Sequence, residues 1–290
     1  MKNKKNKIYF WACDYSPSTG EGRLGRLFVK FLEKKITPIK ISTTHKGILA
    51  YKYINPFIGI IYCWIFFLRK KKVAYINYLP LWNSAIYLLL PPNTVLGPIT
   101  GGSNFSRSNK DYIVRKYIFP LLHKISETII ILRFKNIVFS TNLLKKNLSS
   151  YLLSKSKFNF VLKALKIKKN YIKTNDFCLY YRKHPTKLSN YPFAFIRKLI
   201  LQGFKILVVG DRLNIIGTNN LGFVEHQRLL RILKKTKFTI SSPENIYTLF
   251  LIDCINSNVK ILIDSKKKIN NTKIAKNFLR QNFNQNLYFK

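Results

Sequence analysis

Residues 208–264 read VVGDRLNIIGTNNLGFVEHQRLLRILKKTKFTISSPENIYTLFLIDCINSNVKILID, and the order of apolar and polar runs in this stretch decides the fold class. An apolar strand (205–210) is followed by a helix (225–236), a strand (238–241), a second helix (246–255) and a last strand (259–264). Strands that alternate with helices are typical of parallel sheets that are covered by helices. The stretch therefore predicts an α/β domain.

Three local features of the same stretch suggest a ligand site. Residues 222–224 (GFV) stand before a helix, the strand 238–241 ends in two serines, and the tripeptide 243–245 (PEN) opens the next helix. This order resembles the donor-binding half of glycosyltransferases of the GT-B fold. The resemblance implies that Glu244 binds the donor sugar and that Asp253 binds the nucleotide ribose. It also implies that Asn245 contacts the sugar and that Ser242 or its neighbour Ser241 bonds a phosphate.

The spacing of the two acids departs from that pattern. Glu244 and Asp253 are nine residues apart (253 minus 244). Nine residues make about two and a half turns of helix, so the two carboxylates face different sides. Glu244 also has a structural interpretation, because an acid at a helix start interacts favourably with the helix dipole.

A basic loop follows the first strand of this half of the chain. Residues 180–187 read YYRKHPTK and come at the end of a predicted strand, 177–181. The resemblance implies that Arg182, Lys183 and Lys187 hold the donor diphosphate, and a guanidinium can hold a phosphate through two parallel hydrogen bonds. In a chain so rich in lysine, an ordinary solvated basic loop is the alternative interpretation.

The first half opens with a strand, a loop and a glycine-rich helix start. Residues 6–28 read NKIYFWACDYSPSTGEGRLGRLF, in which Gly20, Gly22 and Gly25 match the spacing GxGxxG. A dinucleotide site needs its first glycine just after the strand and an acid about 20 residues further on. Here residues 14–19 intervene, and the next strand, 36–42, ends in Ser42 without a carboxylate. An NAD-linked enzyme is therefore kept only as a third alternative.

The loop instead predicts a ligand-facing edge of the sheet, because such loops follow the carboxyl ends of parallel strands. Asp14 and Glu21 are candidates for a general base toward an acceptor hydroxyl, or for hydrogen bonds to the acceptor. Gly20 and Gly22 would let the backbone approach the transferred sugar or the acceptor. The acceptor-side loops also include Asn77, at the end of the strand 73–77, and the end of LGPITGG at Thr100, Gly101 and Gly102.

The domain organisation follows from a break in the alternation of predicted strands and helices. Residues 163–175 are rich in lysine, asparagine and threonine and separate the two α/β series. We expect a Rossmann-like acceptor-side domain at 1–165, a short Rossmann-like nucleotide-sugar-binding domain at 176–268 with four strands, and a tail at 269–290 that packs back on the first domain. The two domains would face a cleft, as in the GT-B architecture.

The charge is extreme, with 52 basic and 11 acidic residues and a net charge of +41. Such a charge favours nucleic acid or an anionic membrane as partner. Lysine outnumbers arginine and asparagine outnumbers alanine along the whole chain, which is also what A/T-rich codons produce. The alternative function is a basic nucleic-acid-binding or anionic-membrane-binding protein without catalysis. No RNA-binding motif is present, so no specific nucleic acid is expected.

One apolar run raises the question of a membrane. Residues 53–68 (YINPFIGIIYCWIFFL) are uncharged and precede Arg69 and three lysines. The run is shorter than the roughly 20 residues that a spanning helix needs. We expect a helix that starts at Pro56 and is either buried in the core or rests on the anionic inner membrane beside the lysines.

The four cysteines are far apart and show no metal-ligand spacing, which is typical of reduced thiols in a cytoplasmic protein. The combined prediction is a cytoplasmic, metal-independent glycosyltransferase that acts on hexoses or related sugars. It would move a sugar from a nucleotide-sugar donor to a glycan or lipid-linked acceptor in surface polysaccharide biosynthesis. The nucleotide sugar is the donor substrate, and no cofactor is expected.

Overall fold

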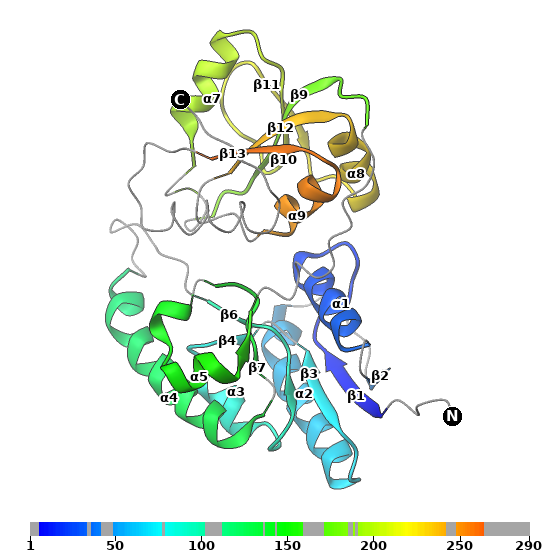
Figure 1. Cartoon of the computed structure of the whole chain (residues 1–290), viewed down its shortest axis with the longest axis vertical. Coiled ribbons are helices and arrows are strands. Elements are labelled where there is room, and N and C mark those ends of the chain that lie inside the picture. The colour runs from blue at the N-terminus through cyan, green and yellow to red at the C-terminus, as the bar shows by residue number, and fades with distance from the viewer. Residues whose placement is uncertain are drawn as a thin grey trace. The chain divides into compact units, whose positions relative to one another are not determined.

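The computed structural model describes residues 6–33, 36–41, 49–76, 79–101, 112–135, 137–142, 144–158, 171–184, 188, 191–241 and 248–263. The described residues up to Phe158 form one compact unit, and those from Tyr171 onward form a second (Figure 1). Each unit has a parallel sheet and a hydrophobic core of its own. The predicted α/β class with two Rossmann-like domains is confirmed, whereas the predicted tail at 269–290 lies outside the described residues.

The first unit begins with a strand, a helix and a strand and continues with shorter elements. Its elements are β1 (Lys7–Ala12), α1 (Gly20–Leu32), β2 (Thr37–Lys40), α2 (Leu49–Leu68), β3 (Val73–Ile76), β4 (Leu79–Pro80), α3 (Ser84–Leu89), β5 (Val95–Leu96), β6 (Ile99–Thr100), the π-helix η1 (Val114–Ile118), α4 (Phe119–Arg133), β7 (Ile137–Val138), the 3-10 helix η2 (Lys145–Asn147), α5 (Ser150–Lys155) and β8 (Ser156–Lys157).

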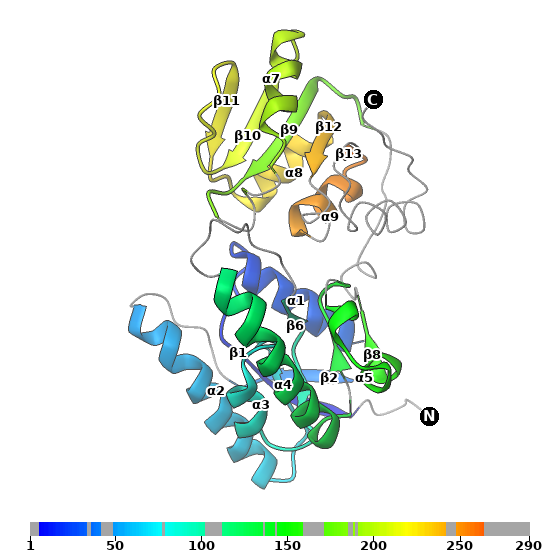
Figure 2. The same cartoon turned by 90° about the vertical axis from the view of Figure 1, so that its left-hand side faces the viewer.

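The main sheet of this unit has the strand order β2-β1-β3-β5, with all neighbours parallel. All four residues of β3 are buried, as expected for a strand with helices on both faces. The rings of Trp11 and Tyr75 stack at 5.0 Å between centroids, so neighbouring strands also share the core through their side chains. Helices α2, α3 and α4 lie side by side on one face (Figure 2).

Helix α2 differs from the sequence-based prediction at its start. It begins at Leu49, so Pro56 lies inside the helix instead of opening it. A proline removes one donor from the helix ladder, yet packing can outweigh that loss. Here the Tyr75 hydroxyl donates to the Pro56 carbonyl at 3.1 Å, and Gly59 lies so close to Trp11 that an added Cβ would stand 2.4 Å from its ring. Among the described residues, no helix is long and apolar enough to cross a membrane.

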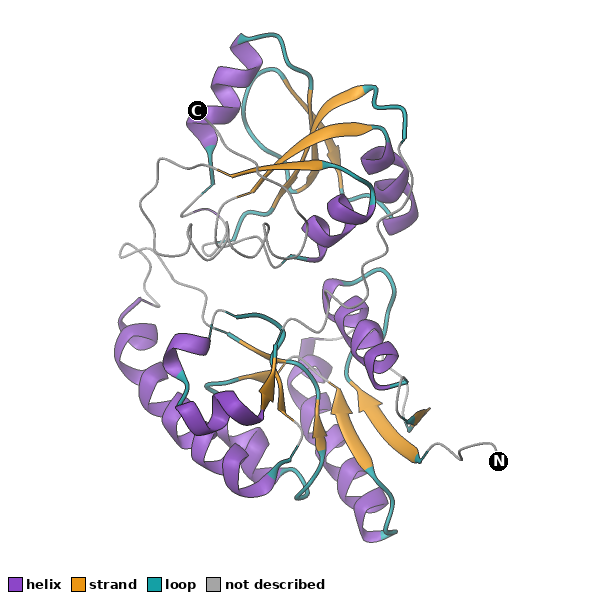
Figure 3. Cartoon of the chain, viewed as in Figure 1, coloured by secondary structure: helices purple, strands orange, loops and turns teal. Residues whose placement is uncertain are grey.

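The second unit consists of one sheet and the helices that connect its strands. Its elements are β9 (Asn175–Tyr181), α7 (Phe193–Leu201), β10 (Ile206–Gly210), β11 (Thr218–Gly222), α8 (His226–Lys234), β12 (Thr236–Ser241), α9 (Leu249–Asn256) and β13 (Lys260–Ile263). The strand order is β11-β10-β9-β12-β13, all parallel (Figure 2). Figure 3 draws the strands of both units in orange. Right-handed crossovers place α7 on one face and α8 and α9 on the other (Figure 1).

The described sheet thus has five strands, and the prediction of four was wrong. The missed strand is β11, whose sequence TNNLG has one β-branched residue, Thr218, beside two asparagines and a glycine, residue types that are depleted in strands. The Asn220 side chain supplies some of the hydrogen bonds that hold this edge strand in place. The Asn220 amide accepts from the Leu213 N–H at 2.8 Å and donates to the Leu213 carbonyl at 3.2 Å, which mimics a backbone pair.

Candidate functional site

The first unit has a reversal of strand order between β1 and β3. Strand β1 lies between β2 and β3, and Ala12 pairs with Ile76, so the loops that follow β1 and β3 start next to each other. In open α/β sheets, ligands bind beyond the carboxyl ends of strands at such a point. The loop after β1 is residues 13–19, and the one after β3 begins with Asn77, which lies outside the described residues.

Asp14 organises the loop after β1. One carboxylate oxygen accepts from the Ser16 N–H at 2.8 Å, and the other accepts from the Thr19 hydroxyl. The Thr19 oxygen then accepts from the Gly22 N–H at 3.1 Å and caps α1. A continuous chain of hydrogen bonds therefore connects this half-buried carboxylate to the start of the helix.

The two glycines that were predicted to approach a ligand differ in their surroundings. A Cβ on Gly22 would stand 2.3 Å from the Ser16 carbonyl oxygen and 2.4 Å from its nitrogen, so only glycine fits there. A Cβ on Gly20 would meet nothing within 4 Å. Between them, Glu21 is exposed in the first turn of α1, where a negative charge suits the helix dipole.

Arg26 of the same helix supports the loop from the other end. Its Nε donates to the Tyr15 carbonyl at 2.7 Å, and its guanidinium lies 4.6 Å from the centre of the Tyr15 ring. Burial raises the pKa of the Tyr15 hydroxyl, while the positive charge of Arg26 acts in the opposite direction. The loop is thus held by contacts from α1 and from within the loop itself.

The predicted acceptor-side residues of the second glycine loop begin at Thr100, the last residue of β6. Thr100 is buried, and within the described part of the chain its hydroxyl has no hydrogen-bond partner. Gly101 has a φ of 132° and packs against Leu144, with an added Cβ 3.5 Å from that side chain. Gly102 lies outside the described residues.

The second unit presents two cations where its strand order reverses. Strand β9 lies between β10 and β12, and Arg182 and Lys183 follow its carboxyl end as exposed residues. Asp211, at the end of β10, accepts from the Lys183 N–H at 2.6 Å and donates its own N–H to the Tyr181 carbonyl at 2.9 Å. The loop after β9 is thus held by its backbone, with both cationic side chains exposed.

A glycine makes this backbone contact possible. Gly210 has a φ of 103°, and an added Cβ would stand 2.3 Å from the Tyr181 carbonyl oxygen. Both the left-handed conformation and the close approach exclude other residues. The run Val-Gly-Asp at the end of β10 is therefore the local signal for the loop contact, and sequence reasoning missed Asp211.

The loop after β12 carries the remaining predicted donor contacts. Strand β12 ends at the buried Ser241 and is the neighbour of β9 in the sheet. Ser242, Glu244 and Asn245 fall in residues 242–247, outside the described residues, as does Lys187. Their roles stay predictions, although the loops that carry them leave adjacent strands at the same edge.

Asp253 is paired with a histidine of a neighbouring helix. Asp253 lies in the middle of α9 and is 5 % exposed, and one of its carboxylate oxygens lies 3.3 Å from Nε2 of His226, the first residue of α8. This is an ion-pair distance without hydrogen-bond geometry. Only the packing of α8 on α9 brings these two side chains together, so the pair cannot be predicted from the spacing of the residues in the sequence. The ribose role of Asp253 stays a prediction.

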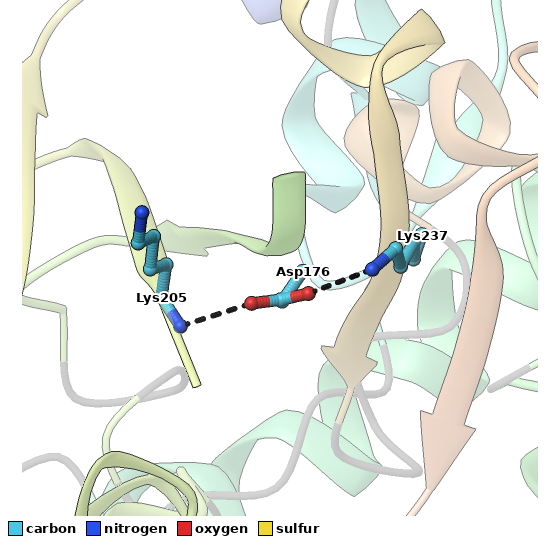
Figure 4. A network of polar contacts seen from close by, with 3 residues as sticks. All are labelled: Asp176, Lys205 and Lys237. Atoms are coloured by element: carbon cyan, nitrogen blue, oxygen red, sulfur yellow. Dashed lines mark hydrogen bonds and ion pairs between the residues drawn. The ribbon is translucent and has the colours of Figure 1, made fainter. Parts of the chain in front are cut away.

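Two other carboxylates have structural roles. Asp176, at the amino end of β9, accepts from Lys237 Nζ at 3.0 Å and from the Lys205 N–H at 3.2 Å, and so connects β9 to β12 and β10 (Figure 4). Glu127 of α4 is buried and accepts from the Ser149 N–H and hydroxyl at the start of α5. Within the ranges that the structure covers, no three His, Cys, Asp or Glu side chains gather as they would around a metal ion.

No protein-family model matches the chain, and no curated protein matches it by sequence. Solved structures do resemble it. Phytolacca americana UGT2, solved with UDP-2-fluoro-glucose and pterostilbene, aligns with 100 % of this chain and 86 % of its own at a TM-score of 0.50 and 9 % identity. A glycosyltransferase from Rickettsia africae aligns at a TM-score of 0.44 and 13 % identity over 90 % of this chain and 79 % of its own. The BGT protein of phage T4, solved with its substrate UDP-glucose, aligns at a TM-score of 0.45 and 10 % identity over 90 % of this chain and 80 % of its own. The likeness to UGT2, together with two parallel Rossmann-like sheets, shows that this chain has the GT-B fold.

Proposed function

We propose that the protein is a glycosyltransferase that moves a sugar from a nucleotide-sugar donor to a glycan or lipid-linked acceptor. The observation that carries this proposal is the pair of exposed cations, Arg182 and Lys183, at the strand reversal of the second sheet. A nucleotide diphosphate fits there, because that edge is where α/β sheets bind ligands and because cations meet its charge.

The chemistry explains why cations are needed. The bond between the sugar and the diphosphate breaks as the acceptor oxygen bonds to the same carbon, and negative charge builds up on the departing diphosphate. Preorganised donors stabilise that charge most when their backbone is fixed in advance. The bond from the Lys183 N–H to Asp211 holds the loop in this way. In the proposal, Lys187 adds a third cation, Glu244 binds the donor sugar, and no metal is used.

The first unit supplies the acceptor side in this proposal. The acceptor hydroxyl must lose its proton, and Asp14 or Glu21 is the base if the reaction inverts the sugar configuration. Both oxygens of Asp14 accept hydrogen bonds within the loop, so this carboxylate also maintains the loop shape. UGT2 and the T4 protein were solved with UDP-sugars, which supports a donor of this class.

The proposed setting is the cytoplasm, where surface polysaccharide precursors would be built. Four free cysteines, three of them buried, suit a reducing compartment. Burial raises the pKa of the Cys63 and Cys178 thiols to about 12, so neither side chain is a reactive thiolate.

The test compares two arginines of the same unit. Arg182→Gln should weaken binding of the preferred donor on the order of 10-fold to 100-fold, because charge-assisted hydrogen bonds contribute roughly 1.5 to 3 kcal/mol. Arg197→Gln, on the exposed side of α7, is the matched control and should bind as the wild type does. Thermal stabilisation by UDP-, GDP- and CMP-sugars selects the donor, and calorimetry gives the affinities.

Two outcomes would contradict the proposal. Stabilisation by NAD and by no nucleotide sugar would favour the dinucleotide alternative. Equal donor affinity in the Arg182 and Arg197 variants would show that the pair of cations at 182 and 183 does not bind the donor.

A further inference from the structure

From residue 54 to its end at Leu68, the exposed side of α2 is apolar. Five side chains of this helix between residues 54 and 68 are exposed, by 38 % to 73 %, and each is Ile, Phe or Leu. They are Ile54, Phe57, Ile61, Ile65 and Leu68. The spacing of three or four residues puts them on one stripe along the helix. Helices on protein surfaces normally carry polar residues on this side, so the stripe indicates a binding face.

The neighbouring helices continue this surface. Trp64 of α2 donates from its indole N–H to the Leu89 carbonyl at the end of α3, at 2.8 Å, and α3 packs on α4. Leu88 and Leu89 are exposed on α3, and Leu121 and Ile125 are exposed on α4. Because α2, α3 and α4 lie side by side (Figure 2), these exposed apolar residues belong to adjacent helices of the first unit.

A cluster of cations stands at the end of the stripe. Helix α2 ends at Leu68 and is followed by Arg69 and the lysines at 70, 71 and 72, all of them exposed. These three lysines, with Asn6, Lys7 and Tyr9 of the β1 side, line an open hollow of about 340 Å³. Its size and its cationic lining suit an anionic headgroup.

The backbone fixes the place of this cluster. The Lys71 N–H donates to the Phe66 carbonyl at 3.0 Å and the Lys70 N–H to the Phe67 carbonyl at 2.9 Å, which closes the helix in a Schellman motif. Lys70 has a φ of 55°, a conformation that glycine adopts with less strain. A lysine occupies this position nevertheless, and it adds charge to the hollow.

We propose that the first unit docks on a bilayer that contains anionic phospholipid. The stripe of α2 inserts into the interface, and the cluster of Lys7 and residues 69–72 binds the headgroups. Apolar side chains beside lysines are the combination by which interfacial helices bind anionic membranes. The proposal does not depend on the glycosyltransferase function, and its test needs no activity.

The test measures binding of the full chain to sedimenting vesicles of phosphatidylcholine, alone or mixed with phosphatidylglycerol. With a net charge of +41, any cation adds some attraction, so each variant needs a control of equal charge. The stripe variant Ile61→Gln/Ile65→Gln is compared with Leu201→Gln/Ile216→Gln, two exposed apolar positions of the second unit. The cluster variant replaces residues 70, 71 and 72 by Gln and is compared with the triple variant Arg197→Gln/Lys198→Gln/Lys235→Gln.

The wild type should sediment with the mixed vesicles and far less with phosphatidylcholine alone. The cluster variant should bind on the order of 100-fold more weakly, because each lysine near an anionic surface contributes roughly a factor of five. The stripe variant should lose most of the binding that persists at high salt, since salt screens charges and leaves apolar insertion intact. Both control variants should stay near the wild type.

Three results would overturn the proposal. Equal losses of vesicle affinity in the cluster variant and its control would show that binding depends only on the total charge of the protein. Unchanged binding of the stripe variant would exclude insertion of α2. A wild-type dimer in light scattering that the stripe variant dissociates, without vesicle binding in either, would show that a second copy covers the face.

Discussion

Carboxylates are rare in this chain, with 11 among 290 residues, so the contacts of each one are informative. Asp176 and Glu127 stabilise the fold, because each accepts hydrogen bonds that join separate elements. Asp14 and Asp211 instead shape loops at the carboxyl ends of strands. Composition alone does not separate these groups, because the distinction depends on which edge of a sheet each residue occupies.

Asp176 leads to a prediction about pH. The hydrogen bonds from Lys237 and from the Lys205 N–H hold the pKa of this carboxyl below its ordinary value of 3.8. A depressed folded-state pKa means that the stabilisation is present above the unfolded-state pKa and is lost as the pH falls through the folded-state pKa. Asp176→Asn should therefore lower the free energy of unfolding at neutral pH by about 0.5 to 1 kcal/mol. The difference from the wild type should shrink as the pH falls below 3.8 and disappear below the folded-state pKa, as measured by urea unfolding across pH.

The two lysines around Asp176 provide the control. Lys237 uses its side chain, whereas Lys205 uses its main-chain N–H (Figure 4). Lys237→Gln should therefore resemble Asp176→Asn, and Lys205→Gln should stay within about 0.5 kcal/mol of the wild type. A larger loss for the Lys205 variant than for the Lys237 variant would refute this account.

At the scale of elements, the start of α1 depends on Gly22 and not on Gly20. Gly22→Ala should disrupt the loop, because its Cβ would overlap the Ser16 backbone and the Asp14 carboxylate. The expected loss of stability is about 1 to 3 kcal/mol. Gly20→Ala should be neutral or slightly stabilising, since its Cβ has open space and alanine favours helix. Thermal unfolding of the two variants measures the contrast.

The same pair of variants tests the loop as a functional element. If the loop lines the acceptor site as proposed, Gly22→Ala should lose transfer activity at a temperature where the variant is still folded. Gly20→Ala reports on close approach of a ligand, because its added methyl group affects only what binds there. Two variants of equal stability would show that the Asp14 loop tolerates the added methyl group.

Most long elements could be predicted from the sequence, and the failures have local causes. The strands around residues 7–12, 175–181 and 206–210 are apolar runs with clear ends, so their positions agree with the prediction within two residues. The start of α2 was misplaced because Pro56 normally opens a helix, yet here the packing of Gly59 and Tyr75 holds it inside one. Strand β11 was missed because a side-chain contact of Asn220 supplies what its composition lacks.

The candidate site was predictable in part. Glycine and charged residues after strand ends pointed to the loops of Asp14 and Arg182, because parallel strands bring such loops to one edge. Asp211 and the pair of His226 with Asp253 were not found, because each depends on a contact between segments distant in sequence. Such contacts form only in the folded unit, and no regular spacing of residues in the sequence indicates them.

At the scale of the whole molecule, the two units have separate hydrophobic cores, and tryptophan fluorescence follows only the first of them. All three tryptophans, Trp11, Trp64 and Trp82, lie in the first unit. Tryptophan fluorescence should therefore follow unfolding of the first unit, whereas circular dichroism follows both. A bound nucleotide sugar should raise the unfolding temperature of the second unit and leave the fluorescence transition unchanged.

Urea or thermal unfolding with both signals, with and without donor, checks this expectation. A fluorescence transition that shifts with the donor as much as the dichroism signal would show that the units unfold together.

The contact between Asp211 and Lys183 has a consequence for how the site can change over time. Asp211 binds the main-chain N–H at position 183, a group that every residue except proline possesses. The side chain at this position can therefore be exchanged by mutation while the loop keeps its shape. If Lys183 contacts the donor as proposed, substitutions at this position can change the preferred ligand during evolution without loss of the fold.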